Sequence, residues 1–326
     1  MFPAPRPFAI WWARETTPPC AVKRLSIIPA TEVTDLPLVS IVTPSLNQGR
    51  FIEETVRSVL GQDYPRIEYL VVDGGSTDET LDVLRRVGGN LRWISEPDHG
   101  QGAAINKGFR LASGEILGWL NSDDTYEARA VSTAVEHLRQ HPDHAMVYGD
   151  ATHVDEQDAE IGPCAYVGPF DLDRLVHESD YIVQPAAFFR RSAFEAVGGL
   201  DESLHWGMDY DLWLKLGRRF PIEYLPRKLA RYRQTGQNKT ALGRFDRFEE
   251  IKRIGERHGA GGLPATFCVD YFWLCVKESG RRAQRMDLRT ALPLAWRGTS
   301  ALFRSPRALR YFLRLCAAKL RGSRPE

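Results

Sequence analysis

Apolar residues in the first half of the chain alternate between two spacings. Short continuous apolar runs, typical of strands buried on both faces, occur at 38–43, 67–72, 91–95 and 116–120. Helices are predicted between and after them at 51–60, 78–84, 100–111 and 128–139. Because strands and helices alternate, we predict an α/β fold with a mainly parallel sheet and helices on both faces.

The second half continues this pattern and then changes character. Further strands are predicted at 145–148, 184–189 and 222–232, and an amphipathic helix opens at Asp209. Residues 1–36 are rich in Pro and show no sustained period, which predicts a poorly ordered leader, and 259–264 have the composition of a linker. We therefore expect a leader at 1–36, one α/β domain at 37–258 and a basic helical extension at 259–326.

The apolar run at 116–120 ends in Asn121, Ser122, Asp123 and Asp124. A buried pair of like charges is unfavourable unless a cation neutralises it, and ligands bind at the ends of central strands in open α/β sheets. A divalent metal that also holds a phosphate group would account for both features. The alternative is an exposed turn in which Asp124 only caps a helix that starts near Tyr126.

Two more predicted strands end in polar residues. Pro44 ends the first strand, in the sequence Thr43-Pro44-Ser45, and the second strand ends on Asp73. Carboxyl ends of parallel strands meet at one edge of a sheet, so these residues and the two aspartates are expected to line one nucleotide crevice. Neither GxGxxG nor GxxxxGK[ST] occurs, which argues against a dehydrogenase or a P-loop ATPase.

Composition narrows the class of protein further. The chain has 326 residues and a formal net charge of +1, so no general affinity for nucleic acid is indicated. Its five Cys are scattered and form no CxxC pair, so the sequence suggests neither a zinc site nor a disulfide framework. A reducing compartment is the default for such a chain.

Three stretches resemble glycosyltransferase family 2, the large inverting family with the GT-A fold. They read VSIVTPSLNQGRFIEETVRSVLGQDYPRIEYLVVDGGSTDET, HGQGAAINKGFRLASGEILGWLNSDD, and QPAAFFRR followed by GGLDESLHWGMDYDLWLKL. The resemblance covers roughly residues 38–240 and implies a GT-A domain that uses a nucleotide-diphosphate sugar. It implies that Thr43 and Pro44 contact the nucleotide and that Asp73 hydrogen-bonds the base. Asp123 then faces the ribose, and Asp124 binds Mg²⁺ or Mn²⁺.

The resemblance also assigns the catalytic step. Asp209 matches the base that takes the proton of the acceptor hydroxyl, and Trp213 matches the aromatic residue that follows it. Positioned bases contribute about 10²–10⁴-fold to rate, and a divalent metal can stabilise the leaving diphosphate. No residue resembles a nucleophile activated by a base, so a single inverting displacement is expected. For Asp211 we favour simple capping of the helix.

Some positions depart from the family pattern. Asn121, Met208 and Thr235 stand where relatives often have Asp, Glu and His, and the His of relatives lies near the pyrophosphate. The QxxRW signature of processive polymer synthases is absent, and RYRQTGQNKT stands in its place, which implies addition of a single sugar.

The predicted function is metal-dependent, non-processive hexosyl transfer to a hydroxyl of a saccharide or lipid-linked acceptor, in cell-surface polysaccharide or glycolipid biosynthesis. Two alternatives stay open. A sugar nucleotidyltransferase would need a Gly- and Lys-rich phosphate signature near its N-terminus, and none is visible. A degenerate sugar-nucleotide-binding relative is suggested by the departures at Asn121 and Thr235.

The last predicted helix begins near Pro306 and has a basic and an apolar side. Arg307, Arg310, Arg314 and Arg321 lie on one side, and Leu309, Phe312, Leu313, Cys316 and Leu320 lie on the other. This pattern favours a helix lying in the plane of an anionic membrane surface, where each basic residue can contribute about 1 kcal/mol. The alternative is packing on the catalytic domain or on another subunit. We expect a cytoplasmic protein that can bind peripherally to the cytoplasmic face of the membrane.

Overall fold

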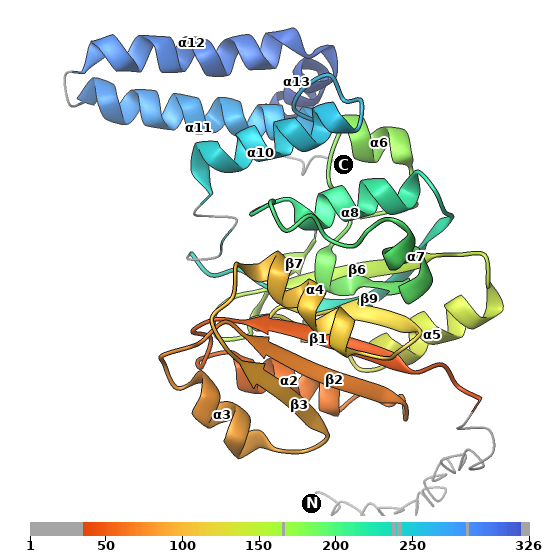
Figure 1. Cartoon of the computed structure of the whole chain (residues 1–326). Helices are drawn as coiled ribbons and strands as arrows, with labels where there is room; N and C mark the ends of the chain where they lie inside the picture. Colours follow the sequence, from red (N-terminus) through yellow and green to blue (C-terminus); the bar gives the residue numbers. More distant parts are fainter. Residues whose placement is uncertain (1–34, 165–166, 237–238, 240–242, 285–286, 321–326) are drawn as a thin grey trace, which may run out of the picture. The chain divides into compact units, whose positions relative to one another are not determined.

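A nine-stranded sheet forms the centre of the described part of the chain (Figure 1). The computed structural model describes residues 35–164, 167–236, 239, 243–284 and 287–320. All but the last two residues of the predicted leader therefore lie outside the described residues. Leu36–Glu326 belong to one compact unit, and the predicted division at 258/259 stays a prediction.

The sheet combines a parallel half with a mixed half. Its strands are β1 (Val39–Ser45), β2 (Ile67–Asp73), β3 (Leu91–Ser95), β4 (Ile116–Trp119), β5 (Thr125–Tyr126), β6 (Met146–Val154), β7 (Glu160–Pro163), β8 (Ala187–Arg190) and β9 (Ile222–Arg233). Their order is β3-β2-β1-β4-β8-β6-β9-β5, and β7 pairs with β6. The first four strands in this order pair in parallel, as do β6 and β9, whereas β5, β7 and β8 run antiparallel to their partners. The predicted α/β class is confirmed.

Helices cover both faces of the sheet, as the alternation of elements predicts. They are α2 (Ile52–Leu60), α3 (Thr80–Val87), α4 (Gln101–Leu111), α5 (Ala130–Gln140), α6 (Leu172–His177), the 3₁₀ helix η1 (Gln184–Ala186), α7 (Arg191–Ala196) and α8 (Met208–Gly217). Successive residues of a strand face opposite sides, so neighbours in β1 enter different cores. Val42 packs in one core with Ile105 of α4, and Ile41 packs in the other with Val56 of α2.

One local prediction is wrong, and so is one alternative. Pro44 does not end the first strand, which runs on to Ser45 with Pro44 opposite Val72. A strand tolerates Pro where one side has no partner, and β4 pairs with β1 only as far as Val42. No helix starts near Tyr126 either. Tyr126 lies in β5, paired with β9, and its ring stacks on Phe188 with centroids 5.2 Å apart. Asp124 is therefore not a helix cap.

The C-terminal helices are α10 (Arg244–Arg257), α11 (Ala265–Gln284), α12 (Leu288–Arg304) and α13 (Pro306–Leu320). Phe267 and Tyr271 of α11 are buried in the same core as α4 and α8. The apolar side of α13 partly packs on α11, because the Phe312 ring lies 5.4 Å from Phe272 and 6.0 Å from Trp273. For Phe312, the alternative of packing within the protein is the one observed. Within the described residues, no helix has both the length and the apolar character needed to cross a membrane.

Gly108 allows α4 to lie directly on the sheet. A Cβ added there would be 2.4 Å from Cγ1 of Val42 and 3.2 Å from Cγ2 of Val72. Val42 is fully buried and its β-branched side chain has little rotamer freedom. We expect Gly108→Ala to destabilise the protein by about 1–3 kcal/mol through overpacking, which outweighs the gain of about 1 kcal/mol in helix propensity. The midpoint of urea unfolding measures this loss.

Gly280 provides a matched control in the exposed interior of α11. No atom lies within 4 Å of its added Cβ, so Gly280→Ala should raise the free energy of unfolding by about 0.5–1 kcal/mol, and with it the urea midpoint. Stabilisation of both variants to the same extent would contradict the close contact between α4 and β1.

Candidate active site

The carboxyl ends of three parallel strands lie on one line at one edge of the sheet. Ser45 of β1 is opposite Asp73 of β2, and Asp73 is opposite Ser95 of β3. β4 ends at Trp119, and the turn with Asp123 and Asp124 follows it. The structure thus brings the predicted residues of these strands to the same edge.

Asp73 is completely buried and organises the loop after β2. Its carboxylate accepts hydrogen bonds from the backbone N–H groups of Gly75 and Ser76 and from the hydroxyls of Ser76 and Ser95. These four bonds hold the β2–α3 loop beside β3. If Asp73 also bound the base of a nucleotide, its carboxylate oxygens would accept that hydrogen bond in addition to the four from this loop and β3.

Thr43 and Pro44 are buried within β1. The Thr43 hydroxyl lies 3.1 Å from the hydroxyl of Tyr69 in the core. The first exposed residue after β1 is Leu46. A nucleotide contact by this segment would therefore involve the backbone after Thr43 rather than its hydroxyl.

Asp124 is a buried carboxylate in the turn after β4. Its Oδ1 accepts a hydrogen bond of 2.9 Å from the backbone N–H of Arg233, and its Oδ2 accepts a longer one of 3.4 Å from Asn121. Burial and the charge of Asp123 raise the pKa of Asp124 well above its usual range. Burial also raises the pKa of Asp123, against the effect of its own backbone N–H and of Arg233. The pair needs additional positive charge to be fully ionised.

Asn121 connects this turn to the rest of the site. Its Oδ1 accepts hydrogen bonds from the Trp119 indole and from Gln101, both 2.8 Å. Its Nδ2 donates to Asp124 and, at 2.9 Å, to Oε1 of Gln184. An Asp could not make the two donated bonds. The departure from the family pattern at Asn121 therefore has a structural role here.

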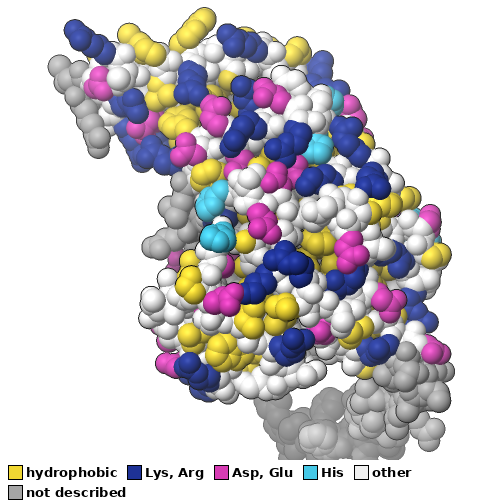
Figure 2. All heavy atoms as spheres, viewed as in Figure 1, with side chains coloured by type: hydrophobic (Ala, Val, Ile, Leu, Met, Phe, Trp, Pro, Cys, Tyr) yellow, Lys and Arg dark blue, Asp and Glu magenta, His cyan; other side chains and the backbone are white. Residues whose placement is uncertain are grey.

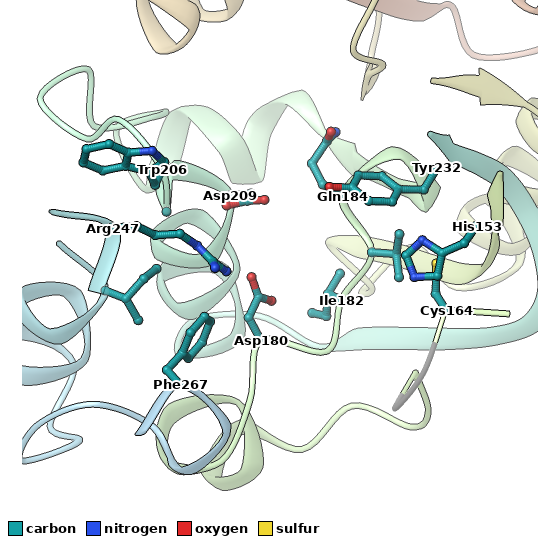
Figure 3. Close-up of a pocket in the computed structure, with 13 residues that line it drawn as sticks. His153, Cys164, Asp180, Ile182, Gln184, Trp206, Asp209, Tyr232, Arg247 and Phe267 are labelled. Atoms are coloured by element: carbon teal, nitrogen blue, oxygen red, sulfur yellow. The ribbon is translucent and has the colours of Figure 1, made fainter. Parts of the chain in front are cut away.

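A cavity of about 230 Å³ lies next to this network, between the sheet and α8, α10 and α11 (Figure 3). Gln184 lines it, together with His153, Cys164, Asp180, Ile182, Val183, Trp206, Gly207, Asp209, Tyr232, Arg247, Ile251 and Phe267. In Figure 3 the carboxylates of Asp180 and Asp209 and the guanidinium of Arg247 point toward the same space. Of the residues predicted for the site, only Asp209 is among those that line this cavity.

Asp180 and Asp209 form a second acidic pair, and sequence reasoning missed Asp180. Burial raises the pKa of Asp209, although the N–H of Tyr210 and the charges of Arg247 and Lys239 oppose the change. Burial and the charge of Asp209 raise the pKa of Asp180 well above its usual range. Two neighbouring carboxylates in such surroundings favour a single proton shared by the pair. The member of the pair that stays ionised can accept a proton.

Glu250 of α10 positions the loop that leads into α8, and it too was missed. Its buried carboxylate accepts hydrogen bonds from the backbone N–H groups of His205, Trp206 and Gly207. Gly207 immediately precedes α8, and Asp209 lies in the first turn of that helix. No local motif marks Glu250, because its partners are more than forty residues away in sequence.

Asp211 and Trp213 do not face the cavity. The predicted capping role of Asp211 is wrong. Its carboxylate is buried and pairs with Lys215 at 2.6 Å and with His258 at 2.9 Å. Capping would need a bond to the helix backbone, whereas the bonds of this carboxylate go to the side chains of Lys215 and His258. Trp213 is fully buried and packs edge-to-face on Phe189, with centroids 6.0 Å apart.

The fold is that of the GT-A glycosyltransferases. TarS from S. aureus, in its crystal structure with UDP-GlcNAc, is similar over 89% of this chain and 93% of that chain, with a TM-score of 0.57 and 16% identity. The mannosyltransferase PcManGT from Pyrobaculum calidifontis, with GDP-Man and Mn²⁺, is similar over 88% of this chain and 81% of that chain, with a TM-score of 0.55 and 20% identity. At these identities the likeness concerns the fold alone.

Sequence comparison gives the family. Residues 40–198 match the family model for Glycosyl transferase family 2. Chondroitin synthase from Escherichia coli is 31% identical over 215 residues, which are 65% of this chain and 31% of that protein. Residues 40–198 are therefore a Glycosyl transferase family 2 domain. The aligned part spans only about a third of the length of this relative.

The charge on Asp124 predicts an unusual effect on stability. Because the folded protein raises its pKa, the free energy of unfolding falls as the pH rises from the ordinary Asp value of about 3.9 to the raised value. Asp124→Asn keeps an oxygen for the Arg233 N–H and removes the charge. We expect it to stabilise the metal-free protein at neutral pH by about 0.5–2 kcal/mol. Thermal melting with a chelator, repeated toward pH 4, should show this gain disappear.

Asp211→Asn makes the same chemical change as Asp124→Asn, but we expect it to change the free energy of unfolding in the opposite direction. Burial alone would raise the pKa of Asp211, but the hydrogen bonds from His258 and Lys215 outweigh it and lower that pKa. The ionised form therefore stabilises the fold above the ordinary pKa, and this contribution is lost as the pH falls. The substitution should cost about 3–5 kcal/mol at neutral pH. A shift in the same direction for both variants would contradict the assigned charges.

Proposed function

We propose that the protein transfers one sugar from a nucleotide-diphosphate sugar to a hydroxyl group, by a single displacement that inverts the anomeric carbon. The observation that carries this proposal is the presence of two acidic pairs, one of which is linked by side-chain hydrogen bonds to a residue that lines the cavity of the other. Asp123 and Asp124 lie at the end of β4, Asp180 and Asp209 face the cavity, and Asn121 links Asp124 to Gln184 of the cavity wall. The first pair suits the donor diphosphate, and the cavity suits the acceptor.

A metal-bound diphosphate fits the turn after β4. The buried carboxylate of Asp124, with its raised pKa, offers the oxygen ligands that Mg²⁺ and Mn²⁺ prefer. Asp124 would hold the metal, and Asp123 would contact the ribose. When bound, the metal would neutralise the negative charge of the diphosphate. The complexes of TarS with UDP-GlcNAc and of PcManGT with GDP-Man and Mn²⁺ support a donor and a metal of these kinds.

Asp209 is the proposed base. The acceptor oxygen loses its proton to Asp209 while it forms a bond to the anomeric carbon, and the bond from that carbon to the diphosphate breaks. This role requires the shared proton of the pair to lie on Asp180, so that Asp209 keeps the charge needed for this step. Glu250 fixes the loop before α8 and thereby the position of Asp209. Absence of the QxxRW signature supports addition of a single sugar.

Asp209→Asn tests the base directly. It preserves the shape of the side chain but cannot accept the proton, so turnover should fall by about 10²–10⁴-fold with donor affinity unchanged. Turnover is measured with a panel of nucleotide sugars, as transfer or as slow hydrolysis. Asp246→Asn, at an exposed position on α10, is the control and should keep full activity. Full activity of Asp209→Asn would refute the assignment, and Asp150 would be the next candidate.

Binding of a nucleoside diphosphate should depend on the metal. We expect Mn²⁺ to tighten binding of UDP or GDP to the wild type, measured by calorimetry. Asp124→Asn should lose most of this effect, whereas Asp209→Asn should keep it. Affinity that is unchanged by a chelator and by Asp124→Asn would rule out the proposed metal site.

We place the proposed membrane contact on α12, where more of the described apolar side chains are exposed than on α13. Leu288, Leu292, Trp296 and Phe303 recur at helical spacing along α12, and each is 57–71% exposed. Arg289 and Arg304 are exposed on the same helix. Hydrophobic and basic side chains lie together on the surface over α12 in Figure 2. Exposed Trp and Leu beside Arg are typical of a helix at an anionic membrane surface, and a lipid-linked acceptor would be presented there.

A double substitution on α12 tests this surface. Leu292→Ser with Trp296→Ser should reduce flotation with anionic liposomes at least about tenfold, because each buried side chain is worth about 1.5–3 kcal/mol. Melting should stay unchanged, since both side chains are exposed. Flotation of the wild type should weaken with salt. Leu111→Ser, an exposed apolar residue on α4, is the control. Equal flotation of all variants would exclude α12 as the contact.

A further inference from the structure

Three histidines converge where α5 leads into β6. One ring nitrogen from each of His137, His141 and His144 lies within 4.8 Å of the others. Nε2 of His137 is 3.0 Å from Nδ1 of His144, and the three rings stack with centroids 4.3–5.2 Å apart. In the described residues, this is the one group of three or more His, Cys, Asp or Glu with such spacing.

The backbone around the histidines is held in place by contacts that leave the rings available. His137 and His141 are four residues apart at the end of α5, the spacing that puts two imidazoles on one helix face. Arg190, at the end of β8, donates hydrogen bonds to the carbonyls of Leu138, His141 and His144. The N–H of His144 bonds to the carbonyl of His141. The loop is therefore preorganised. The guanidinium of Arg190 bonds to backbone carbonyl oxygens of this loop and not to the imidazole rings.

The ligand chemistry selects one class of ion. Neutral imidazole nitrogens suit Zn²⁺ and related transition metals, whereas Mg²⁺ and Mn²⁺ prefer oxygen ligands. Glu223, at the start of β9, is near enough for its negative charge to interact with the imidazole of His137. A carboxylate beside a ligating His is a common second partner of zinc sites.

We propose that His137, His141 and His144 bind a Zn²⁺ ion that ties the end of α5 to the start of β6. Zinc bound by imidazoles at about 2.0–2.1 Å needs ligand nitrogens roughly 3.4 Å apart, so small rotations of the exposed His141 ring complete the site. The fourth position is open to water. The site lies at the start of β6, roughly 25 Å along the strand from His153 at the cavity. It is therefore separate from the proposed transfer site and independent of that proposal.

Zinc binding by the full chain, without any affinity tag, tests the site. Calorimetry with ZnCl₂ is run in excess Mg²⁺, which occupies carboxylate sites, and melting is followed with and without Zn²⁺. We expect one tightly bound Zn²⁺ per chain and a rise in the melting temperature, because an ion that binds only the folded state stabilises it. His141→Ala should weaken zinc binding at least roughly tenfold and abolish the rise.

Two further variants make the result decisive. His144→Gln should lose zinc binding as His141→Ala does. His177→Ala removes a surface histidine that pairs with Asp173, and it should bind zinc as the wild type does. His141 is exposed, so its removal should leave melting without zinc unchanged. Zinc affinity that is equal in the wild type, His141→Ala and His144→Gln, or no binding by the wild type, would overturn the proposal.

Discussion

A buried guanidinium fixes the acidic turn on which the proposed donor site depends. Arg233, at the end of β9, donates from Nε to the carbonyl of Asp123 and from its terminal nitrogens to the carbonyl of Asp155 and the carboxylate of Glu54. Its own backbone N–H bonds to the Asp124 carboxylate. One residue thus joins the turn after β4 to α2, β6 and β9. Because the buried guanidinium donates to three separate segments, and a buried donor left without its partner is costly, this clamp holds the turn in one conformation.

The bonds from Arg233 position Asp124 but do not fully neutralise its negative charge. A buried carboxylate with a raised pKa destabilises the folded protein when it is ionised, and Asp123 beside it adds to that cost. Polar groups held in such surroundings are characteristic of sites that bind a ligand, because the ligand supplies the missing charge. Asn121 donates hydrogen bonds to Asp124 and to Gln184, and Gln184 lines the cavity. The proposed donor site is therefore linked to a residue of the cavity wall by side-chain hydrogen bonds.

The sequence predicted the parallel strands because each is a continuous apolar run that enters a buried sheet. It also placed Asp73 and Asp124 at the same edge, since strand ends in such a sheet must meet. Contacts between residues far apart in the sequence could not be predicted in this way. Asp211 looked like a helix cap from its neighbours alone, whereas its partners include His258, 47 positions away. Asp180 and Glu250 lie in no recognisable motif, and their roles arise only when α8 and α10 pack together. The alternative of a helix starting near Tyr126 fails because Tyr126 belongs to β5, which is two residues long and is defined by pairing with β9.

The proposed donor site is tested most directly by anomalous X-ray scattering from a crystal grown with Mn²⁺ and a nucleoside diphosphate sugar. The expected result is a manganese peak within coordination distance of the Asp124 carboxylate and of both phosphates, with Asp123 beside the ribose. A nucleotide bound at this edge without manganese, or a manganese peak that touches neither Asp124 nor the diphosphate, would contradict it.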